Sequence, residues 1–306
     1  MSETGTDNGT EHTGPWYANK REITIQHYRI NRRPLVQQTI FQRPDDFFDH
    51  LVEVLLFGQR VDVPGRGQRT WILGNSEIAQ DESYLAGEIG YETPSTSMTP
   101  IYDEQAQEWI EEEQPAGGAS SPFMIWAESQ TLSVFKHPSF SEAVSATVIQ
   151  KLLNDGESQR AEQSTEWAVE PELDSDEFEE WLSEIDKLDH LKFHVRLPNP
   201  DGEEHFQFLL DHMDGMDARE FTHTLKPRSE QGLSKDLGGD RITSGLRAMA
   251  ERSYAQVTAK GRTVAGALKK FSQRQSAKRT YVPGPSNRTA ANEVLAETSQ
   301  SMGSKE

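Results

Sequence analysis

Apolar and polar residues alternate regularly in the stretch between residues 191 and 262. Residues 192–197 (KFHVRL) place polar and apolar side chains on opposite faces, which predicts a strand with one apolar face. Residues 206–213 carry apolar side chains at positions i, i+3, i+4 and i+7, the stripe of an amphipathic helix. The order β-α-β-α-β that results is typical of a small, ferredoxin-like α+β layer. Its remaining members are expected strands at 219–225 and 254–259 and a helix at 242–252.

The first half of the chain predicts a similar mixture of strands and helices. Residues 22–31 alternate as a strand, and Asp45 or Asp46 is expected to begin a helix that buries Phe47 to Leu55. Residues 75–121 are polar and interrupted by proline and glycine, so they are expected to be mostly loop, with a short acidic helix at 105–113. The other expected elements are a strand at 35–41, hairpins at 60–73 and 122–135, and helices at 140–153 and 175–188.

Together these elements predict an α+β protein of two domains, each a small mixed or antiparallel sheet with packed helices, plus disordered termini. The N-terminal α+β domain is expected at 20–153, and the C-terminal α+β domain, with a basic end, at 177–282. The acidic segment 154–176 shows little periodicity and is expected to be a linker. Residues 1–19 and 283–306 are expected to be a disordered leader and tail.

The uneven distribution of charge changes the functional picture. The 306 residues carry a formal net charge of −19, with 34% hydrophobic residues and a mean hydropathy of −0.74. Residues 241–306, however, hold twelve Lys and Arg against four Asp and Glu. An acidic protein repels polyanions, so binding of nucleic acid must be local to the basic segments.

The residue types and segments that the sequence lacks exclude several classes of protein. The chain has no cysteine, which excludes disulfide frameworks, cysteine zinc sites, iron–sulfur clusters and thiol nucleophiles, and agrees with the expected cytoplasmic location. The first fourteen residues lack the apolar core of a signal peptide. No stretch of about 18 apolar residues occurs, so direct membrane insertion is not expected.

The basic end supplies the first set of candidate nucleic-acid-binding residues. Lys and Arg there can neutralise phosphates without base contacts, and the interleaved Phe271 and Tyr281 can stack on unpaired bases. The alternative is that this segment docks on the acidic surface of the protein itself or of a partner subunit. The candidates are Arg247, Arg252, Lys260, Arg262, Lys269, Lys270, Arg274, Lys278 and Arg279.

A second candidate set lies near the N-terminus. Arg32 and Arg33 are adjacent, and Arg66 lies in a glycine-rich turn, so each group is compact enough to hold a phosphate through bidentate hydrogen bonds. The alternative, which base rates favour, is that these are ordinary strand-edge and turn residues.

No motif for catalysis or metal binding is found. Five histidines fall between residues 190 and 223, but none forms an HxH, HExxH or other compact ligand set. GxxxxGK[ST], GxGxxG and GxSxG are absent, and the abundant carboxylates give no specific pair. We therefore expect no catalytic residues, no metal site and no cofactor. A metal-dependent nuclease is kept as a further alternative whose site would be assembled from distant residues.

Residues 120–143 (SSPFMIWAESQTLSVFKHPSFSEA) resemble the central hairpin of the Rex-type phage-exclusion proteins, the A component of a two-part system of temperate phages. In both, a proline- and aromatic-rich strand, a short acidic turn and a second strand precede a helix. The similarity is one of pattern and spacing across most of 20–260, and it matches no functional residue individually. It implies a two-domain α+β homodimer that binds double-stranded DNA without sequence preference and changes its domain arrangement, with a membrane-protein effector as a further partner.

The expected function is therefore sequence-non-specific DNA binding, through backbone phosphates, by a homodimer of a phage-exclusion (antiviral defence) system. The alternative is a protein–protein regulator or sensor that controls a partner effector without binding nucleic acid. The acidic linker departs from what a DNA-binding protein would be expected to contain.

Overall fold

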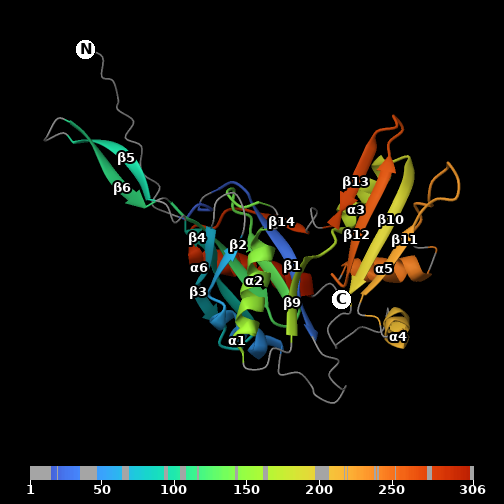
Figure 1. Ribbon diagram of the computed structural model, residues 1–306, viewed down its shortest axis with the longest axis horizontal. Helices are drawn as coiled ribbons and strands as arrows, with labels where there is room; N and C mark the ends of the chain where they lie inside the picture. The colour runs from blue at the N-terminus through green and yellow to red at the C-terminus, as the bar shows by residue number, and fades with distance from the viewer. Residues whose placement is uncertain are drawn as a thin grey trace, which may run out of the picture.

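The computed structural model shows an α+β protein with six helices in its described residues, an eight-stranded sheet, a four-stranded sheet and a two-stranded hairpin (Figure 1). This confirms the predicted fold class. The described residues are 15–303, with gaps at 19, 35–46, 64–68, 93–95, 104–107, 116, 142–143, 161–164, 197–206, 217, 219, 238, 240, 252 and 274–277. The expected strand at 35–41 and the residues Arg66, Arg252 and Arg274 lie outside them.

The eight-stranded sheet is organised around β1 (Ile23–Pro34). The order is β14-β1-β8-β7-β4-β3-β2, and β9 pairs with the second half of β1 beside β14. All of these pairings are antiparallel. The other strands are β2 (Arg60–Val63), β3 (Arg69–Ile78), β4 (Tyr84–Glu92), β7 (Ala119–Trp126), β8 (Thr131–Phe135), β9 (Thr165–Pro171) and β14 (Arg279–Val282).

Helices cover both faces of this sheet because its central strands are apolar on both sides. On one face, α1 (Phe47–Phe57) and α2 (Val144–Ser158) bury Leu51, Leu55 and Leu152 against Tyr28 and other strand residues. On the opposite face, α6 (Arg288–Gly303) packs Ala291 and Leu295 against strand residues such as Ile25 and Phe135. Burial of apolar side chains on both faces is the main favourable term for such a layered fold.

The four-stranded sheet has helices on one face only. Its order is β11-β10-β12-β13, all antiparallel. The buried face packs against α3 (Ser175–Glu184), α4 (Gln207–Gly215) and α5 (Arg241–Glu251), with Phe193 and Val257 among the core residues. No helix in the described part of the chain covers the other face, which we call the open face. The strands are β10 (Lys187–Arg196), β11 (Glu220–Leu225), β12 (Ala255–Arg262) and β13 (Leu268–Ser272).

The four-stranded sheet is an insertion into the eight-stranded domain. The chain leaves after β9 and returns in β14, and both of these strands pair with β1. The outgoing and returning segments are neighbours, since the Lys278 amide donates to the Glu172 carbonyl at 3.3 Å. Buried Gln273 joins the two parts: its Nε2 donates to the Pro171 carbonyl at 2.9 Å, and its Oε1 accepts from the Val257 amide at 2.9 Å.

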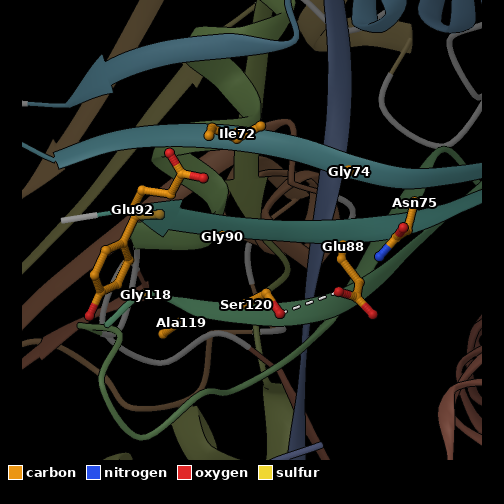
Figure 2. A pocket seen from close by; sticks show the side chains of 10 residues that line it. Ile72, Gly74, Asn75, Glu88, Gly90, Glu92, Gly118, Ala119 and Ser120 are labelled. Carbon is orange, nitrogen blue, oxygen red and sulfur yellow. Dashed lines mark hydrogen bonds between the residues drawn. The ribbon is translucent and has the colours of Figure 1, made fainter. Parts of the chain in front are cut away.

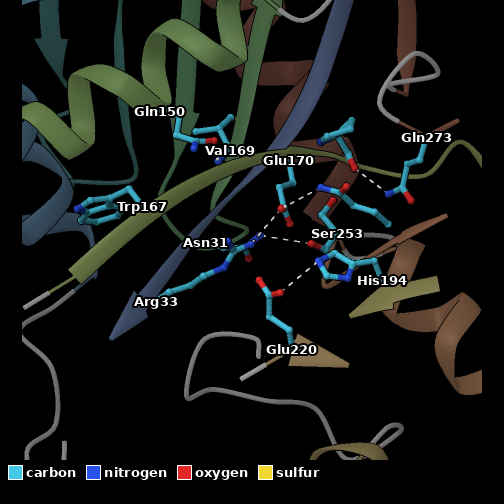
Figure 3. A network of polar contacts seen from close by, with 12 residues as sticks. Asn31, Arg33, Gln150, Trp167, Val169, Glu170, His194, Glu220, Ser253 and Gln273 are labelled. Carbon is cyan, nitrogen blue, oxygen red and sulfur yellow. Dashed lines mark hydrogen bonds and ion pairs between the residues drawn. The ribbon is translucent and has the colours of Figure 1, made fainter. Parts of the chain in front are cut away.

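Polar contacts complete the junction between the two sheets (Figure 3). Arg33 forms an ion pair of 3.0 Å with Glu170, and Gln256 on β12 donates to the same carboxylate oxygen at 3.0 Å. Arg29 donates to the Tyr254 hydroxyl at 2.9 Å and lies over its ring. These contacts fix the end of the open face that lies nearest to β9.

Four expectations about the organisation of the chain are corrected. The expected linker at 154–176 contains the end of α2 and the strand β9, in which Trp167 is fully buried. The expected disordered tail contains α6, and β14 belongs to the eight-stranded sheet and not to the C-terminal domain. Tyr17, in the expected leader, is also buried, against Phe135. The sequence did not indicate this burial, because these segments bury only a few large side chains. Their many acidic and small residues give them a low mean hydropathy.

A further correction concerns residues 75–121. Instead of the expected loop with a helix at 105–113, they contain β4 and a hairpin of β5 (Thr96–Asp103) and β6 (Glu108–Pro115). In Figure 1 this hairpin projects away from the body of the protein. Its sequence contains six Asp and Glu and no Lys or Arg between residues 96 and 115.

Candidate nucleic-acid interface

Several candidate basic residues are engaged with acidic partners. On the helical side of the four-stranded sheet, Arg247 binds Glu179 at 2.6 Å and Glu251 at 3.0 Å. Burial acts to lower the pKa of Arg247, but these two hydrogen-bonded carboxylates raise it overall. Arg247 is thus held in place by the protein's own acidic groups, as the docking alternative predicts.

Two more members of the basic end are held in the same way. Arg262 binds Asp189 at 3.0 Å, and Lys269 binds Glu184 at 2.5 Å. Asp189 also lies 3.6 Å from Lys187, so one carboxylate serves two cations at this end of the sheet. Arg247, Arg262 and Lys269 are therefore not part of the candidate interface.

The N-terminal pair of arginines is placed at two different internal sites. Arg32 is 9% exposed, and its guanidinium lies 3.3 Å from Nδ1 of buried His50. Arg33 points to the other side of β1, toward Glu170 at the junction. Adjacent residues of a strand point to opposite faces, so Arg32 and Arg33 cannot hold one phosphate together.

Lys278 and Arg279 lie where the chain re-enters the eight-stranded sheet. The Lys278 carbonyl accepts from the His27 amide at 3.0 Å, and Arg279 pairs in register with Gln26. Both are partly buried. Their positions at the junction separate them from the remaining candidates, Lys260 and Lys270.

Lys260 and Lys270 belong to a line of basic residues that crosses the open face, which we call the basic row. Lys260 on β12 lies directly opposite Lys270 on β13, and on its other side directly opposite His190 on β10. Leu225, the last residue of β11, pairs with Leu191, and Lys226 follows it on the side of His190, where its charge acts on that ring. The basic row therefore crosses β10, β12 and β13 through His190, Lys260 and Lys270, and Lys226 extends it just beyond the end of β11.

The basic row carries charge that is not neutralised by the protein. None of its three lysines, nor Lys192 in the next row, forms an ion pair with a carboxylate of the described residues. Lys226, Lys260 and Lys270 are exposed. Neighbouring strands are about 4.8 Å apart, so the basic row is about 14 Å long, which is room for more than one phosphate group.

His190 is the centre of this arrangement. Partial burial lowers its pKa, and the charges of Lys260, Lys226 and Lys192 lower it further. Its Nδ1 is shielded from solvent and has no hydrogen-bond partner among the described residues. An imidazole surrounded by cations, without a carboxylate or a carbonyl bonded to it, is a favourable surrounding for an anion and an unfavourable one for a metal ion.

Polar residues flank the basic row on the side nearer to β9. Beside the basic row, Thr224, Lys192, Thr258 and Ser272 form the next row across the sheet. Hydroxyl groups can donate hydrogen bonds to phosphate oxygens, whereas this row offers no aromatic ring for stacking on bases. These two rows are thus suited to contacts with a phosphate backbone.

A family match covers both sheets. The family described as a domain of unknown function (DUF4747) matches residues 38–299. The chain belongs to the DUF4747 family. The match includes every described element except β1 and the last residues of α6. The basic row lies within the matched residues, and the junction lies within them except for its residues on β1. No curated protein and no solved structure matches the chain significantly.

This DUF4747 chain also has a shallow pocket on the α6 face of the eight-stranded sheet, with a volume of about 370 Å³ (Figure 2). Glycines of β3 and β4 form its floor, and Glu88 and Glu92 supply its charge. Glu88 accepts from the Ser120 hydroxyl at 3.3 Å and lies 3.8 Å from Arg288 of α6. The acidic lining of this pocket disfavours phosphate binding. The pocket is therefore not a candidate for contact with nucleic acid.

Two buried polar networks of the DUF4747 chain resemble catalytic groups in composition. His27 contacts the hydroxyls of Ser133 at 2.9 Å and Thr280 at 3.0 Å, and Ser133 contacts Ser299 at 2.7 Å. His27, Ser133 and Ser299 are all fully buried, so no substrate reaches them in this state. The network links β1 and β8 to α6, and its hydrogen bonds satisfy polar groups that would otherwise destabilise the core.

The second network links β1, α1, α2 and β9. His50 bonds Glu157 at 2.7 Å, and the Trp167 indole donates to the same carboxylate oxygen at 3.1 Å. Burial lowers the pKa of His50, although Glu157 acts in the opposite direction. Both side chains are buried, and Arg32 beside His50 is occupied within the network. We assign it the role of orienting the helices on the sheet.

The four described histidines between residues 190 and 223 are dispersed over the four-stranded sheet and α4, and His205 lies outside the described residues. His194 bonds Thr222 at 3.0 Å and lies 3.8 Å from Glu220, while His223 stacks on Phe221. No group of three His, Asp or Glu residues in the described ranges is arranged to hold a metal ion. No helix among the described residues is both long and apolar enough to cross a membrane.

The residues that sequence reasoning missed are His190, Lys192 and Lys226. The sequence places Lys192 and His194 on the polar face of a strand, but it does not show which residues lie opposite them. Only the register of three strand pairs brings Lys226, His190, Lys260 and Lys270 into line.

Proposed function

We propose that this protein binds nucleic acid, most simply double-stranded DNA, without sequence preference, through backbone phosphates on the open face of its four-stranded sheet. The observation that supports the proposal is the basic row, whose lysines are exposed and form no ion pair within the described residues. Each lysine that neutralises a phosphate releases counterions, and this release drives binding in a salt-dependent way.

The acidic remainder of the protein limits where a polyanion can bind. Arg247, Arg262 and Lys269 are paired with carboxylates, so they add little to the attraction of phosphate. The interface is thus restricted to the open face, and the affinity should be modest and sensitive to salt. A role in phage exclusion and a homodimeric state belong to the proposal only through the resemblance to the Rex-type proteins, in pattern and spacing across most of residues 20–260.

The test is a gel-shift titration with unrelated duplexes between about 50 mM and 200 mM salt. The double variant Lys260→Gln/Lys270→Gln should bind at least about tenfold more weakly, and its dependence on log salt should be shallower by about two. The matched control is Lys269→Gln, which removes the same charge from the adjacent residue of β13 but on the helical face, where Glu184 already holds it. Absence of any shift by the wild-type protein at low salt would refute the proposal.

A second function is favoured by a different observation. The ion pairs of Arg247, Arg262 and Lys269 show that much of the basic end serves the protein's own structure. A regulator that controls a partner protein would need no free phosphate site. Wild-type protein that shifts no duplex but co-purifies with one protein in stoichiometric amount would select this alternative.

A further inference from the structure

We propose that the basic row contains one discrete phosphate-binding position, centred on the imidazole of His190 and surrounded by Lys260, Lys226 and Lys192, and that occupation of this position is coupled to uptake of a proton by His190. The inference deepens the proposed function, because a phosphate of the nucleic-acid backbone would be the ligand. It applies equally to a free phosphate, so the two can be tested separately.

The geometry of the open face singles out His190. Lys260 lies directly across from it on β12, and the register of β11 brings Lys226 to its other side. Lys192 lies two residues further along the same face of β10. The charges of three lysines thus act on one imidazole, from β10 itself, from β12 and from the residue that follows β11. In the absence of an anion, these like charges repel one another.

The nearest carboxylate does not relieve this repulsion. Asp189 precedes His190 at an irregularity in the pairing of β10 with β12, and its two oxygens are directed to Lys187 and Arg262. The charged residues that face His190 are therefore Lys226 from the β11 side, Lys260 from β12 and Lys192 on β10 itself. A bound phosphate would supply the negative charge that these three lysines lack among the described residues.

The ring itself lacks a partner. Nδ1 of His190 is shielded from solvent and has no hydrogen bond among the described residues. An N–H at Nδ1 would be buried without an acceptor, so the neutral ring favours the tautomer with its proton on Nε2, and the free ring resists a second proton. The proton taken up with phosphate goes to Nδ1, where the charge of the phosphate stabilises it without a hydrogen bond. Nε2 is then the donor available to a phosphate oxygen, while the lysines act as charges without fixed direction.

Proton uptake follows from the charges. In the free protein, burial and the three lysines hold the pKa of His190 below its usual value. A bound phosphate offsets the lysine charges and so raises this pKa. A group whose pKa is higher in the complex makes binding stronger at low pH, and this gain is lost as the pH rises from the free to the bound pKa. Each unit of difference corresponds to about a tenfold change in affinity.

The first experiment measures the ring directly. The imidazole resonances of the full-length protein, with histidine labelled and His190 assigned by its absence in His190→Gln, are titrated over about pH 4 to 8 in phosphate and in chloride of equal ionic strength. The expected result is a higher midpoint for His190 in phosphate, with the midpoint of His194 unchanged. An equal midpoint for His190 in the two salts would overturn the inference.

The second experiment measures affinity for a duplex between about pH 5.5 and 8. Wild-type binding should weaken by about tenfold for each unit by which phosphate raised the midpoint. Binding by His190→Gln should vary much less, because glutamine keeps a donor but cannot titrate. The matched control is His194→Gln, on the same face of the same strand, whose ring already bonds Thr222; it should keep the wild-type pH dependence.

The outcomes separate this inference from the proposed function. A duplex that binds with the same pH dependence in wild-type and His190→Gln protein would overturn the His190 site and leave non-specific binding intact. A midpoint that rises in phosphate, with no binding of any duplex, would support the phosphate position and overturn the nucleic-acid proposal. If His190 responds to neither ligand, the inference fails.

Discussion

Lys260 and Lys270 lie directly opposite each other on β12 and β13, and no carboxylate of the described residues pairs with either of them. Like charges at opposed positions of an antiparallel pair are destabilising. The chain nevertheless places acidic partners beside the neighbouring Lys269 and Arg262. The repulsion between Lys260 and Lys270 disfavours folding, whereas the neighbouring ion pairs favour it. An anionic ligand bound between the two lysines would relieve this repulsion.

The variant Lys270→Glu should therefore be more stable than the wild type and bind DNA less well. A glutamate opposite Lys260 replaces a repulsive pair by an attractive one, which is worth roughly 0.2–1 kcal/mol relative to a pair of alanines. Urea unfolding would measure the stability, and the gel shift would measure binding. Lys269→Glu is the control, since it should destabilise by placing a second carboxylate beside Glu184. A Lys270→Glu protein that is both less stable and unimpaired in binding would contradict the role of the basic row.

His27 predicts how stability depends on pH. Burial, with a smaller effect of Lys278, lowers its pKa from 6.5 to about 3. The unfolded chain binds a proton at His27 below about pH 6.5, but the folded protein does not until about pH 3. Stability from this residue is complete above the unfolded pKa and should fall by about 1.4 kcal/mol for each pH unit between these limits.

Urea unfolding over that range would check the slope, with His27→Gln as the comparison. The variant should be less stable at neutral pH and should lose part of the slope. An unchanged slope would mean that other groups dominate the acid response.

Gly58 and Gly156 predict a strict limit on side-chain size where α1 crosses α2. A Cβ on Gly156 would lie 2.0 Å from the Val54 carbonyl oxygen, and a Cβ on Gly58 would lie 2.0 Å from that of Leu152. Backbone atoms cannot move aside as flexible side chains can, so Gly156→Ala should destabilise by about 3 kcal/mol or more, or prevent folding.

Gly215, at the end of α4, has open space around the position of an added Cβ. Gly215→Ala is therefore the matched control and should change stability by less than about 1 kcal/mol. Thermal unfolding of both variants would decide. A Gly156→Ala protein with wild-type stability would show that the helices can separate at little expense.

Gln273 should govern whether the two sheets unfold together. Its side chain makes three hydrogen bonds, to the Val257 amide and to the carbonyls of Pro171 and Ala250. Gln273→Ala removes all three bonds, although the Ala250 carbonyl still accepts from the Ser253 amide at 3.0 Å. Each buried group that is left without a partner costs about 1–3 kcal/mol. Calorimetry should show one transition in the wild type that broadens or divides in the variant. Gln256→Ala, which removes one partly buried bond to Glu170, should have a smaller effect.

The sequence was a good guide to the elements with strong periodicity. The alternation around Phe193, the helical stripe of α1 and the hairpin of β7 and β8 were all predicted with the correct type of structure. It failed for β9 and α6 because their burial depends on a few residues, such as Trp167 and Leu295, among acidic or small neighbours. Tertiary pairing with β1 and packing on the sheet outweigh the local composition there.

The candidate site could be predicted only in part. Lys260 and Lys270 were expected from the change of charge along the chain, and the structure supports their exposure. Lys226 and His190 were missed because β10, which holds His190, and the end of β11, which Lys226 follows, are adjacent in space but separated in sequence. The charge pattern of the sequence also did not distinguish Lys269 from Lys270. Lys269 lies on the helical face and pairs with Glu184, whereas Lys270 lies on the open face.

The return of the chain from β13 to β14 has a consequence for modularity. Since the Lys278 amide already bonds the Glu172 carbonyl, the two points at which the chain enters and leaves the four-stranded sheet are in contact. A short turn could join them, so we expect that the smaller sheet can be removed or replaced as one unit. The eight-stranded domain would keep β1, β14 and α6 in place, and the surface that carries the basic row could diverge independently of its support.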